Sequence, residues 1–238
     1  MSSPVYRRIL LKLSGEVLAG EQDFGINPTK ATELAKEIKS IHEMGVDIIL
    51  IIGGGNIFRG MQAASKGMDR VTGDYLGMLA TIMNAISLQD ALEKNGVETR
   101  TLSAITVSQI SEPYIRRRAL RHLDKGRVVI VAGGTGNPYF TTDTAAALRA
   151  TELKAQVLLK GTKVDGVFDK DPVVYSDAVR YNNVSFTEVL GKNLRVMDLT
   201  AITLCKENAL PICVFNINNK GDLKRVVEGK NIGTNIIE

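Results

Sequence analysis

The sequence predicts an α/β protein, a three-layer sandwich whose mostly parallel central sheet is covered by helices on both faces. Short β-branched strand patterns alternate with helical patterns along the chain, and the connections between them are short, as in crossover units. Several strand patterns, such as Ile48 to Ile52, are apolar at every position, which is typical of parallel strands buried on both faces. No linker, repeat or low-complexity stretch interrupts the 238 residues, so we expect one domain over 1–238.

The first half of the chain supplies three strand patterns. Asn27 and Pro28 are good starting residues for a helix, and Gly45 and the pair Asn95-Gly96 are good stop signals. The predicted elements are a strand over 8–13, a glycine-punctuated hairpin or loop over 18–26, a helix over 27–45, a strand over 46–52, a helix over 72–94 and a strand over 97–102.

The second half continues the alternation. Its glycine-rich segments again follow strands, as the first-half loops do. The predicted elements are a helix over 112–124, a strand over 127–132, a loop over 133–143, a helix over 144–153, a strand over 157–160, an irregular connection over 161–172, a helix near 198–208, a strand over 212–215, a helix over 222–228 and a short strand near 234–237.

Composition excludes two classes of protein. Hydrophobic residues make up 44% and charged residues 24%, which is too apolar for a disordered chain. No apolar run approaches the roughly 20 residues of a membrane span. The first residues lead directly into a strand pattern without a signal peptide, so we expect a cytoplasmic protein with no membrane partner. A net charge of +4 indicates anionic partners without separating nucleotides from nucleic acid.

Cysteine and histidine offer no site of their own. Cys205 and Cys213 lack a disulfide framework, and we interpret them as buried thiols. His42 and His122 are too few for a zinc site or a catalytic triad, and we interpret both as surface positions on helices.

Four segments fall at the carboxyl ends of predicted strands, where open α/β sheets bind ligands. They are Lys12, Gly53 to Arg59, Gly133 to Asp143 and Lys160. We expect these segments to converge on one crevice.

The glycines Gly53, Gly54 and Gly55 let backbone N–H groups approach an anion closely. A tight turn without a ligand explains the glycines equally well, but Arg59 adds a guanidinium suited to phosphate oxygens. The loop lacks the Lys-Ser or Lys-Thr of a Walker motif, Phe58 replaces the glycine that a dinucleotide fingerprint needs, and the protein kinase motifs are absent.

The loop Gly133 to Asp143 combines glycines, hydroxyls, two aromatic side chains and one carboxylate, a mixture that suits a nucleotide. The alternative makes Thr142 or Asp143 an ordinary helix cap, and one residue can both cap the helix and bind a ligand.

Lys12 and Lys160 end buried strands. Either side chain alone could snorkel to solvent, but the two together are typical of a phosphoryl-transfer site.

Arg116, Arg117, Arg118 and Arg121 share one short helix. Successive residues point around a helix and no aromatic residues are interleaved, so we interpret this as a solvated helix or a subunit contact rather than a nucleic-acid site.

Six motifs together resemble those of the bacterial UMP kinases in the amino acid kinase family, and the likeness runs from Val5 to Ile237. The motifs are Lys12-Leu13-Ser14-Gly15, the loop 53–60, Gly73-Asp74, the loop 135–143, the segment 160–168 and Val196-Met197-Asp198. The resemblance implies the amino acid kinase fold and ATP-dependent phosphorylation of UMP to UDP with Mg²⁺, on the pyrimidine nucleotide route, by a cytoplasmic homohexamer.

The resemblance also implies roles for single residues. ATP would be bound by Lys12, Leu13, Ser14, Gly15, Gly55, Arg59, Thr162, Phe168 and Asp171. UMP would be bound by Gly54, Asp74, Thr135, Gly136, Asn137, Pro138, Tyr139, Phe140, Thr141 and Thr142. The catalytic set would be Lys12, Arg59, Asp143, Lys160 and Asp198, with Mg²⁺ carried by the ATP phosphates and not bound directly by the protein.

Regulation and assembly follow from the same resemblance. GTP activation and UTP inhibition are expected, with effector-linked residues Gly20, Glu21, Gln22, Asp23, Phe24, Gly25, Arg100 and Arg127. Gln89 and Glu93 stand where basic residues would better suit a triphosphate. The helix from Thr72 is apolar on more than one side, as expected for a deeply buried helix or one shared between subunits.

Three alternatives stay open at this point. A kinase of the same family could phosphorylate a carboxylate or carbamate, although the loop 137–142 favours a base. A nucleotide-binding regulator without catalysis and an RNA-binding protein that uses the arginine helix are further alternatives. Lys12, Arg59, Asp143 and Lys160 favour an active enzyme.

Overall fold

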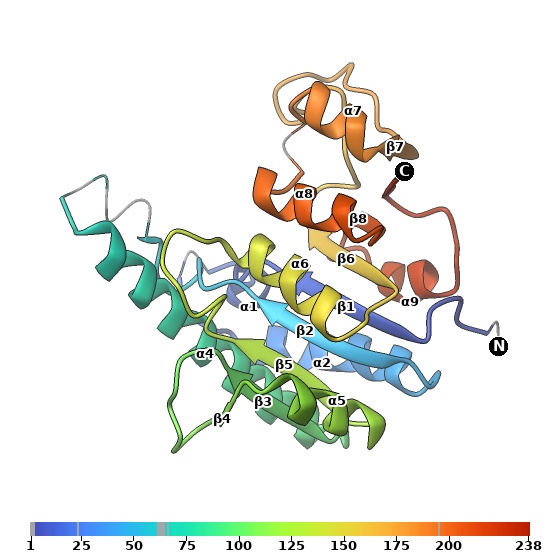
Figure 1. Cartoon of the computed structure of the whole chain (residues 1–238). Helices are drawn as coiled ribbons and strands as arrows, with labels where there is room; N and C mark the ends of the chain where they lie inside the picture. The colour runs from blue at the N-terminus through green and yellow to red at the C-terminus, as the bar shows by residue number, and fades with distance from the viewer. Residues whose placement is uncertain (1–2, 23, 61–64, 66, 195) are drawn as a thin grey trace.

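One sheet organises the protein in the computed structural model, which describes residues 3–22, 24–60, 65, 67–194 and 196–238. Its strand order in this part of the chain is β4-β3-β5-β2-β1-β6-β8-β9-β7 (Figure 1). The strands are β1 (Arg8–Leu13), β2 (Asp47–Ile52), β3 (Thr99–Ser103), β4 (Glu112–Pro113), β5 (Val128–Ala132), β6 (Val157–Thr162), β7 (Asn183–Ser185), β8 (Ile212–Asn216) and β9 (Thr234–Ile237). The β8–β9 pair is antiparallel and the other described pairs are parallel, which confirms the predicted sheet.

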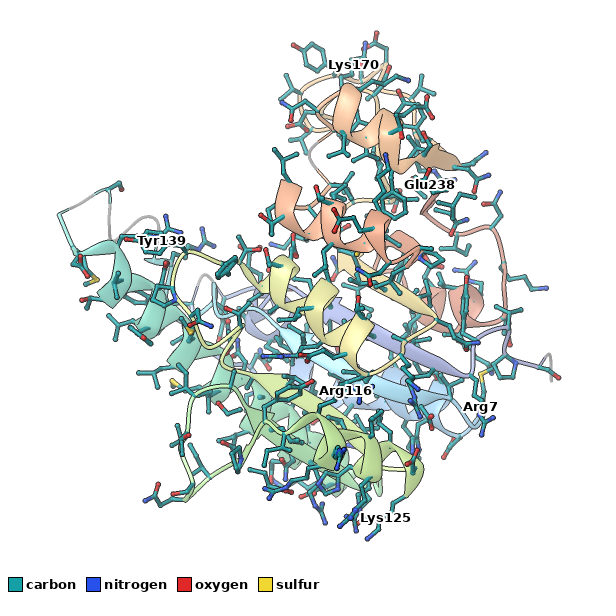
Figure 2. All side chains as sticks on the ribbon, in the orientation of Figure 1. Arg7, Arg116, Lys125, Tyr139, Lys170 and Glu238 are labelled. Carbon is teal, nitrogen blue, oxygen red and sulfur yellow. The ribbon has the colours of Figure 1, made fainter. Side chains whose placement is uncertain are left out.

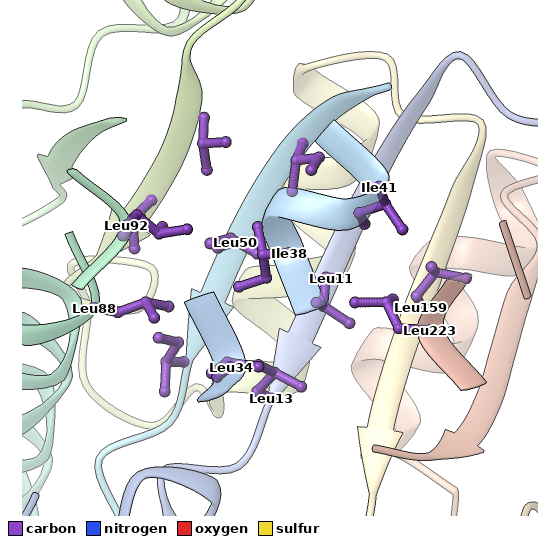
Figure 3. Packing of buried hydrophobic residues seen from close by; sticks show 14 of the residues in the cluster. Leu11, Leu13, Leu34, Ile38, Ile41, Leu50, Leu88, Leu92, Leu159 and Leu223 are labelled. Carbon is purple, nitrogen blue, oxygen red and sulfur yellow. The ribbon is translucent and has the colours of Figure 1, made fainter. Parts of the chain in front are cut away.

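Helices cover both faces of the sheet. They are α1 (Glu16–Ala19), α2 (Pro28–His42), α4 (Arg70–Lys94), α5 (Arg116–Asp124), α6 (Thr142–Glu152), α7 (Phe186–Gly191), α8 (Leu199–Glu207) and α9 (Asp222–Val227). The side chains of β1 divide between two cores, because Ile9, Leu11 and Leu13 pack with α2, α4 and α9, whereas Leu10 packs with α5, α6 and α8. Figure 3 shows the first core, where Leu34 and Ile38 of α2 lie over the strands. The predicted three-layer arrangement is therefore confirmed.

Several helix ends follow the predicted chemistry. The side chain of Asn27 accepts hydrogen bonds from Thr29 N and Lys30 N and so caps α2. The long helix α4 begins instead at Arg70, because the carboxylate of Asp69 caps it through Thr72 N. Figure 1 shows the N-terminal part of α4 projecting away from the sheet.

Some local predictions were wrong. The segment 18–26 was predicted as a hairpin or a loop. Leu18 and Ala19 instead end the helix α1, and the described residues from Gly20 to Ile26 form a loop, so the loop alternative holds there. The residues predicted to begin a helix at Glu112 form the short strand β4, and α5 starts only at Arg116. The elements β7 and α7 were not predicted at all.

The histidine interpretation was wrong for one residue. His122 is buried, with its Nε2 3.1 Å from Glu112 Oε1 and its Nδ1 3.2 Å from Arg127 Nη1. His42 stays partly exposed and contacts Gly126 O. Cys205 and Cys213 are buried and unpaired, as predicted, and burial raises the pKa of each thiol to about 12.

None of the helices in the described ranges is both long and apolar enough to cross a membrane.

Candidate active site

Two lysines lie side by side at the carboxyl end of the sheet. Lys12 of β1 and Lys160 of β6 occupy paired positions in the parallel register. Because strand side chains alternate, both point to the face of the sheet that α6 covers. Lys12 is 8% exposed, so its ammonium group is removed from bulk water and needs an anionic partner.

Asp143, in the first turn of α6, is that partner. Its Oδ1 lies 2.6 Å from Lys12 Nζ and its Oδ2 lies 2.8 Å from Lys160 Nζ. Burial alone would raise the pKa of Asp143, but the two ammonium groups outweigh it and hold that pKa below its usual range. Burial also lowers the pKa of Lys160, and the neighbouring Lys12 charge adds to this effect while Asp143 opposes it. One carboxylate thus holds two cations in fixed positions.

A second carboxylate, Asp198, borders this cluster. It caps α8 by accepting from Ala201 N, and it also accepts from the hydroxyl of Thr144 at 2.9 Å. The hydroxyl of Thr141 donates to Asp198 as well, and Lys160 donates to Val196 O. The predicted motif 196–198 is therefore joined directly to the start of α6. The cap of α6 is Thr141, not Thr142 or Asp143 as the alternative interpretation had it.

The glycine loop after β2 lies against this end of the sheet. Gly53 N donates to Leu13 O, and a Cβ placed on Gly53 would lie 3.4 Å from Gly15 N and 3.6 Å from Thr142 Oγ1. A Cβ on Gly54 would lie only 2.8 Å from Gly77 O of α4, so a close approach of helix and loop requires glycine there. The segments at Leu13 to Gly15, at Gly53 and at the start of α6 therefore converge, as expected for the crevice.

Arg59 ends this loop and is held by a residue that sequence reasoning missed. Its Nη2 lies 2.8 Å from Glu16 Oε1, and its Nε donates to Gly55 O at 3.0 Å. Glu16 also pairs with Lys163 at 2.7 Å. The hydrogen bond from Lys163, with added charge from Arg59, lowers the pKa of Glu16. The only sequence signal for these partners was position, since they directly follow the predicted ATP residues Gly15 and Thr162.

A cavity of about 680 Å³ adjoins Glu16. Its lining comes from α1, α2 and the segments that follow β6 and β8, and includes Gly20, Lys163 and Lys220. It therefore borders the donor-side segments of the predicted ATP site.

Asp74 joins α4 to the loop that precedes α6. Its Oδ2 accepts from Tyr139 N at 2.8 Å, and both of its oxygens accept from Arg70 Nε at 2.9 Å. The guanidinium of Arg70 also lies 5.6 Å from the centre of the Tyr139 ring, beside the start of α4 (Figure 2). Tyr139 has a φ of 72°, which is unusual for a residue other than glycine. Arg70, which sequence reasoning missed, therefore contacts both a predicted UMP residue and the predicted base-binding loop.

The other predicted UMP residues follow this loop. Thr135 Oγ1 donates to Asn137 O, while Gly136 and the preceding glycines have positive φ. Tyr139 and Phe140 are exposed, although the guanidinium of Arg70 lies over the Tyr139 ring. Pro138 lies between Asn137 and Tyr139 in the same loop.

Three predicted ATP residues, Thr162, Phe168 and Asp171, are less closely tied to the lysines. Thr162 ends β6, two residues after Lys160, and its hydroxyl donates to Val164 O. The backbone of Phe168 forms an isolated antiparallel β-bridge with that of Arg180. Asp171 accepts from Val173 N in a turn, a contact internal to its own segment that does not join it to the lysine cluster.

Three of the predicted effector residues, Gly25, Arg100 and Arg127, make internal contacts. Gly25 N donates to Asn56 O, and Glu21 and Phe24 are exposed; Asp23 lies outside the described residues. Arg100 and Arg127 both pair with Glu98, at 3.1 and 2.8 Å. Arg100 also pairs with Glu93. The carboxylates of Glu93 and Glu98 thus neutralise part of the arginine charge.

Within the described residues, no group of three or more His, Cys, Asp and Glu side chains could hold a metal ion. The carboxylates of Asp143 and Asp198 already accept from lysine, hydroxyl or backbone donors. This donor set suits a divalent cation that arrives on the phosphates of a nucleotide, with no cage made by the protein alone.

Comparison with known proteins gives close matches over nearly the whole chain. The profile of the amino acid kinase family matches residues 7–216. The crystal structure of UMP kinase from Bacillus anthracis is 39% identical, with a TM-score of 0.94 and coverage of 98% of this chain and 96% of that chain. UMP kinase from Ureaplasma parvum is 38% identical, with a TM-score of 0.92 and coverage of 98% and 99%. Uridylate kinase from Archaeoglobus fulgidus is 29% identical, with a TM-score of 0.74 and coverage of 96% and 99%.

Proposed function

Because the chain belongs to the amino acid kinase family, a family of phosphotransferases, we propose that it transfers the γ-phosphoryl group of ATP to UMP and produces UDP and ADP. The observation that carries this proposal is the arrangement of Lys12, Asp143 and Lys160 beside the glycine loop. Two buried cations held by one carboxylate provide positive charge where a phosphoryl group would cross between two nucleotides.

The phosphate of UMP is itself the nucleophile. Phosphate monoesters lose their second proton with a pKa of about 6, so the acceptor oxygen is largely ionised at neutral pH. No general base is needed, which agrees with a site whose carboxylates are already occupied by donors. The attacking oxygen forms a bond to the γ-phosphorus of ATP as the bond to the β,γ-bridging oxygen breaks, and ADP leaves with that electron pair.

The proposed work of the protein is alignment and charge stabilisation. Lys12 and Lys160 would stabilise the negative charge of the transferring group, while Asp143 and Asp198 keep the lysines and α6 in position. Arg59 would exchange Glu16 for phosphate oxygens when nucleotide binds, because phosphate matches its guanidinium geometry. A nucleotide-bound Mg²⁺ would add neutralisation of the β- and γ-phosphate charge.

The acceptor side is proposed from Asp74 and the exposed aromatic loop. The carboxylate of Asp74 can accept hydrogen bonds from ribose hydroxyls, and Tyr139 or Phe140 can lie against the base. A small carboxylate acceptor would use neither feature. Similarity to proteins named UMP kinase supports a pyrimidine nucleotide in this position.

Assembly, regulation and location are further parts of the proposal. Leu76, Leu79 and Met83 form an exposed apolar stripe on α4, which supports self-association, and we expect a homohexamer. We also expect activation by GTP, inhibition by UTP and a place in cytoplasmic pyrimidine nucleotide synthesis. GTP titration without any change in rate would contradict the activation.

An acceptor panel tests the reaction. The protein is assayed for ADP formation with ATP and Mg²⁺ against UMP, CMP, dUMP, AMP and small carboxylates. We expect turnover with UMP far above the others. Turnover confined to a small carboxylate would show that the acceptor is a carboxylate and not UMP. ATP binding without turnover would favour a regulatory protein.

A further inference from the structure

The Asn56 and Asn84 side chains form a fully buried amide pair below the predicted phosphate loops. Asn56 Nδ2 donates to Asn84 Oδ1 at 3.0 Å, and Asn84 Nδ2 donates to Asn56 Oδ1 at 2.7 Å. Asn84 is 0% and Asn56 1% exposed. Buried amides are costly unless their hydrogen bonds are complete, so the pair requires further partners.

Two backbone carbonyls complete the pair. Asn56 Nδ2 also donates to Gly25 O at 2.8 Å, and Asn84 Nδ2 also donates to Gly53 O at 2.7 Å. A carbonyl can only accept, so these two contacts determine which end of each amide is nitrogen. All four amide N–H groups are then used, and each side chain can adopt only one orientation.

Gly15 lies directly on this pair. A Cβ placed on Gly15 would collide with Asn56 Oδ1 and with Gly53 O, and would lie 2.9 Å from Asn84 Nδ2. The backbone of the loop at Gly15 therefore rests on the amides with no space between them. Any shift of either amide must move Gly15, Gly53 or both.

The same pair reaches two more distant segments. Asn84 lies in α4 beside the exposed Met83. Asn56 makes two hydrogen bonds with Gly25, because its side chain donates to Gly25 O and its backbone carbonyl accepts from Gly25 N. Four segments, at Gly15, Gly25, Gly53 and Asn84, thus meet at one hydrogen-bonded unit.

We propose that the Asn56–Asn84 amide pair is a positioning unit that sets the backbone of the Gly15 and Gly53 loops for donor-phosphate binding, and that it couples these loops to α4 and to the segment at Gly25. The inference rests on the proposed function, because it assumes that the triphosphate of ATP lies on these loops. The pair does not touch the nucleotide, so it acts through the glycine backbone. Misplacement of reacting groups by about 1 Å costs on the order of a hundredfold in rate, so a small shift is sufficient for a large effect.

The test removes the pair from the side of α4. Asn84→Asp keeps the shape but places a second oxygen against Gly53 O and Asn56 Oδ1, and Asn84→Ala removes the amide without adding charge. Leu88→Ala is the matched control, because Leu88 lies one turn further along α4 and is equally buried. ATP affinity is measured by calorimetry without acceptor, kcat and KM with UMP, and thermal midpoints for all four proteins.

We expect both Asn84 variants to bind ATP at least about tenfold more weakly, or to lose about ten- to hundredfold in kcat. Leu88→Ala should lower the thermal midpoint and leave both quantities near wild type. Folded Asn84 variants with wild-type ATP affinity and kcat would overturn the inference and leave the proposed function intact. A wild-type protein that does not bind ATP would contradict both.

Discussion

The ammonium group of Lys12 lies 2.6 Å from Asp143 Oδ1, and the other oxygen of the same carboxylate pairs with Lys160. Both lysines are therefore held in position by a carboxylate of the protein itself. Preorganised charge of this kind contributes to catalysis because no reorganisation is needed when negative charge moves.

Lys12→Ala tests the catalytic role of this charge. We expect kcat to fall on the order of a hundred- to thousandfold, by analogy with the loss of one preorganised donor. The exposed Lys125 at the end of α5 gives a matched control, and Lys125→Ala should keep wild-type turnover. Near-normal turnover of a folded Lys12→Ala variant would remove Lys12 from the catalytic role.

Asp143→Asn tests the buried ion pairs through stability. Because the pKa of Asp143 in the folded protein lies below its ordinary value of 3.8, the ionised carboxylate stabilises the fold above about pH 4. That stabilisation is lost as the pH falls through the lowered pKa. We expect wild type to exceed Asp143→Asn by about 3–5 kcal/mol at pH 7, and the difference to shrink below pH 4.

Urea unfolding at a series of pH values measures this difference. Asp90→Asn is the control, since Asp90 makes an exposed ion pair with Lys94 on α4 that should contribute at most about 0.5 kcal/mol. A stability difference for Asp143→Asn that does not change with pH would show that its ion pairs are not the cause.

Arg70→Gln tests the acceptor side. The variant loses the ion pair with Asp74 and the contact with the Tyr139 ring, so the direct hydrogen bond from Tyr139 N is left to hold Asp74 against the loop. We expect KM for UMP to rise about tenfold, as for the loss of one charged hydrogen bond, with KM for ATP unchanged. Arg117→Gln, on the exposed face of α5, should leave both constants unchanged. Equal rises for UMP and ATP would point to general disruption of the fold instead.

Met83→Glu tests self-association through α4. Met83 is 55% exposed on the apolar stripe, and a charge there should be incompatible with a buried subunit contact. We expect sedimentation to show smaller particles than for wild type. Val173→Glu is the control, because Val173 is also an exposed apolar residue, lies in a different segment and should not change the mass. A monomeric wild-type protein would contradict the proposed assembly.

Much of the fold could be predicted because its signals are local. The strands β1 and β2 contain the apolar runs Ile9–Leu11 and Ile48–Ile52, and Asn27 with Pro28 marks the start of α2. The signals fail where the elements are short: β7 contains one apolar residue, Val184, and pairs only with the distant β9. Burial of His122 also depends on partners from other elements, Glu112 and Arg127, which no local pattern reveals.

The site was predictable where residues end strands. Lys12 and Lys160 could be placed together because parallel strands end at one edge. Glu16, Arg70 and the Asn56–Asn84 pair could not be found in this way. Their roles come from contacts that no local pattern reveals, such as those of Glu16 with Arg59, 43 positions away, and of Asn56 with Asn84, 28 positions away. A glutamate or a polar residue inside a helix is ordinary in sequence terms.

Transfer of label from ATP tests the central claim most directly. The protein is incubated with ATP labelled in the γ-phosphoryl group, Mg²⁺ and UMP, and the products are separated. The proposed reaction predicts label in UDP in equal amount to the ADP formed, with little in the Lys12→Ala variant. Label that stays in ATP or appears only as inorganic phosphate, in folded protein that binds both nucleotides, would contradict phosphoryl transfer to UMP.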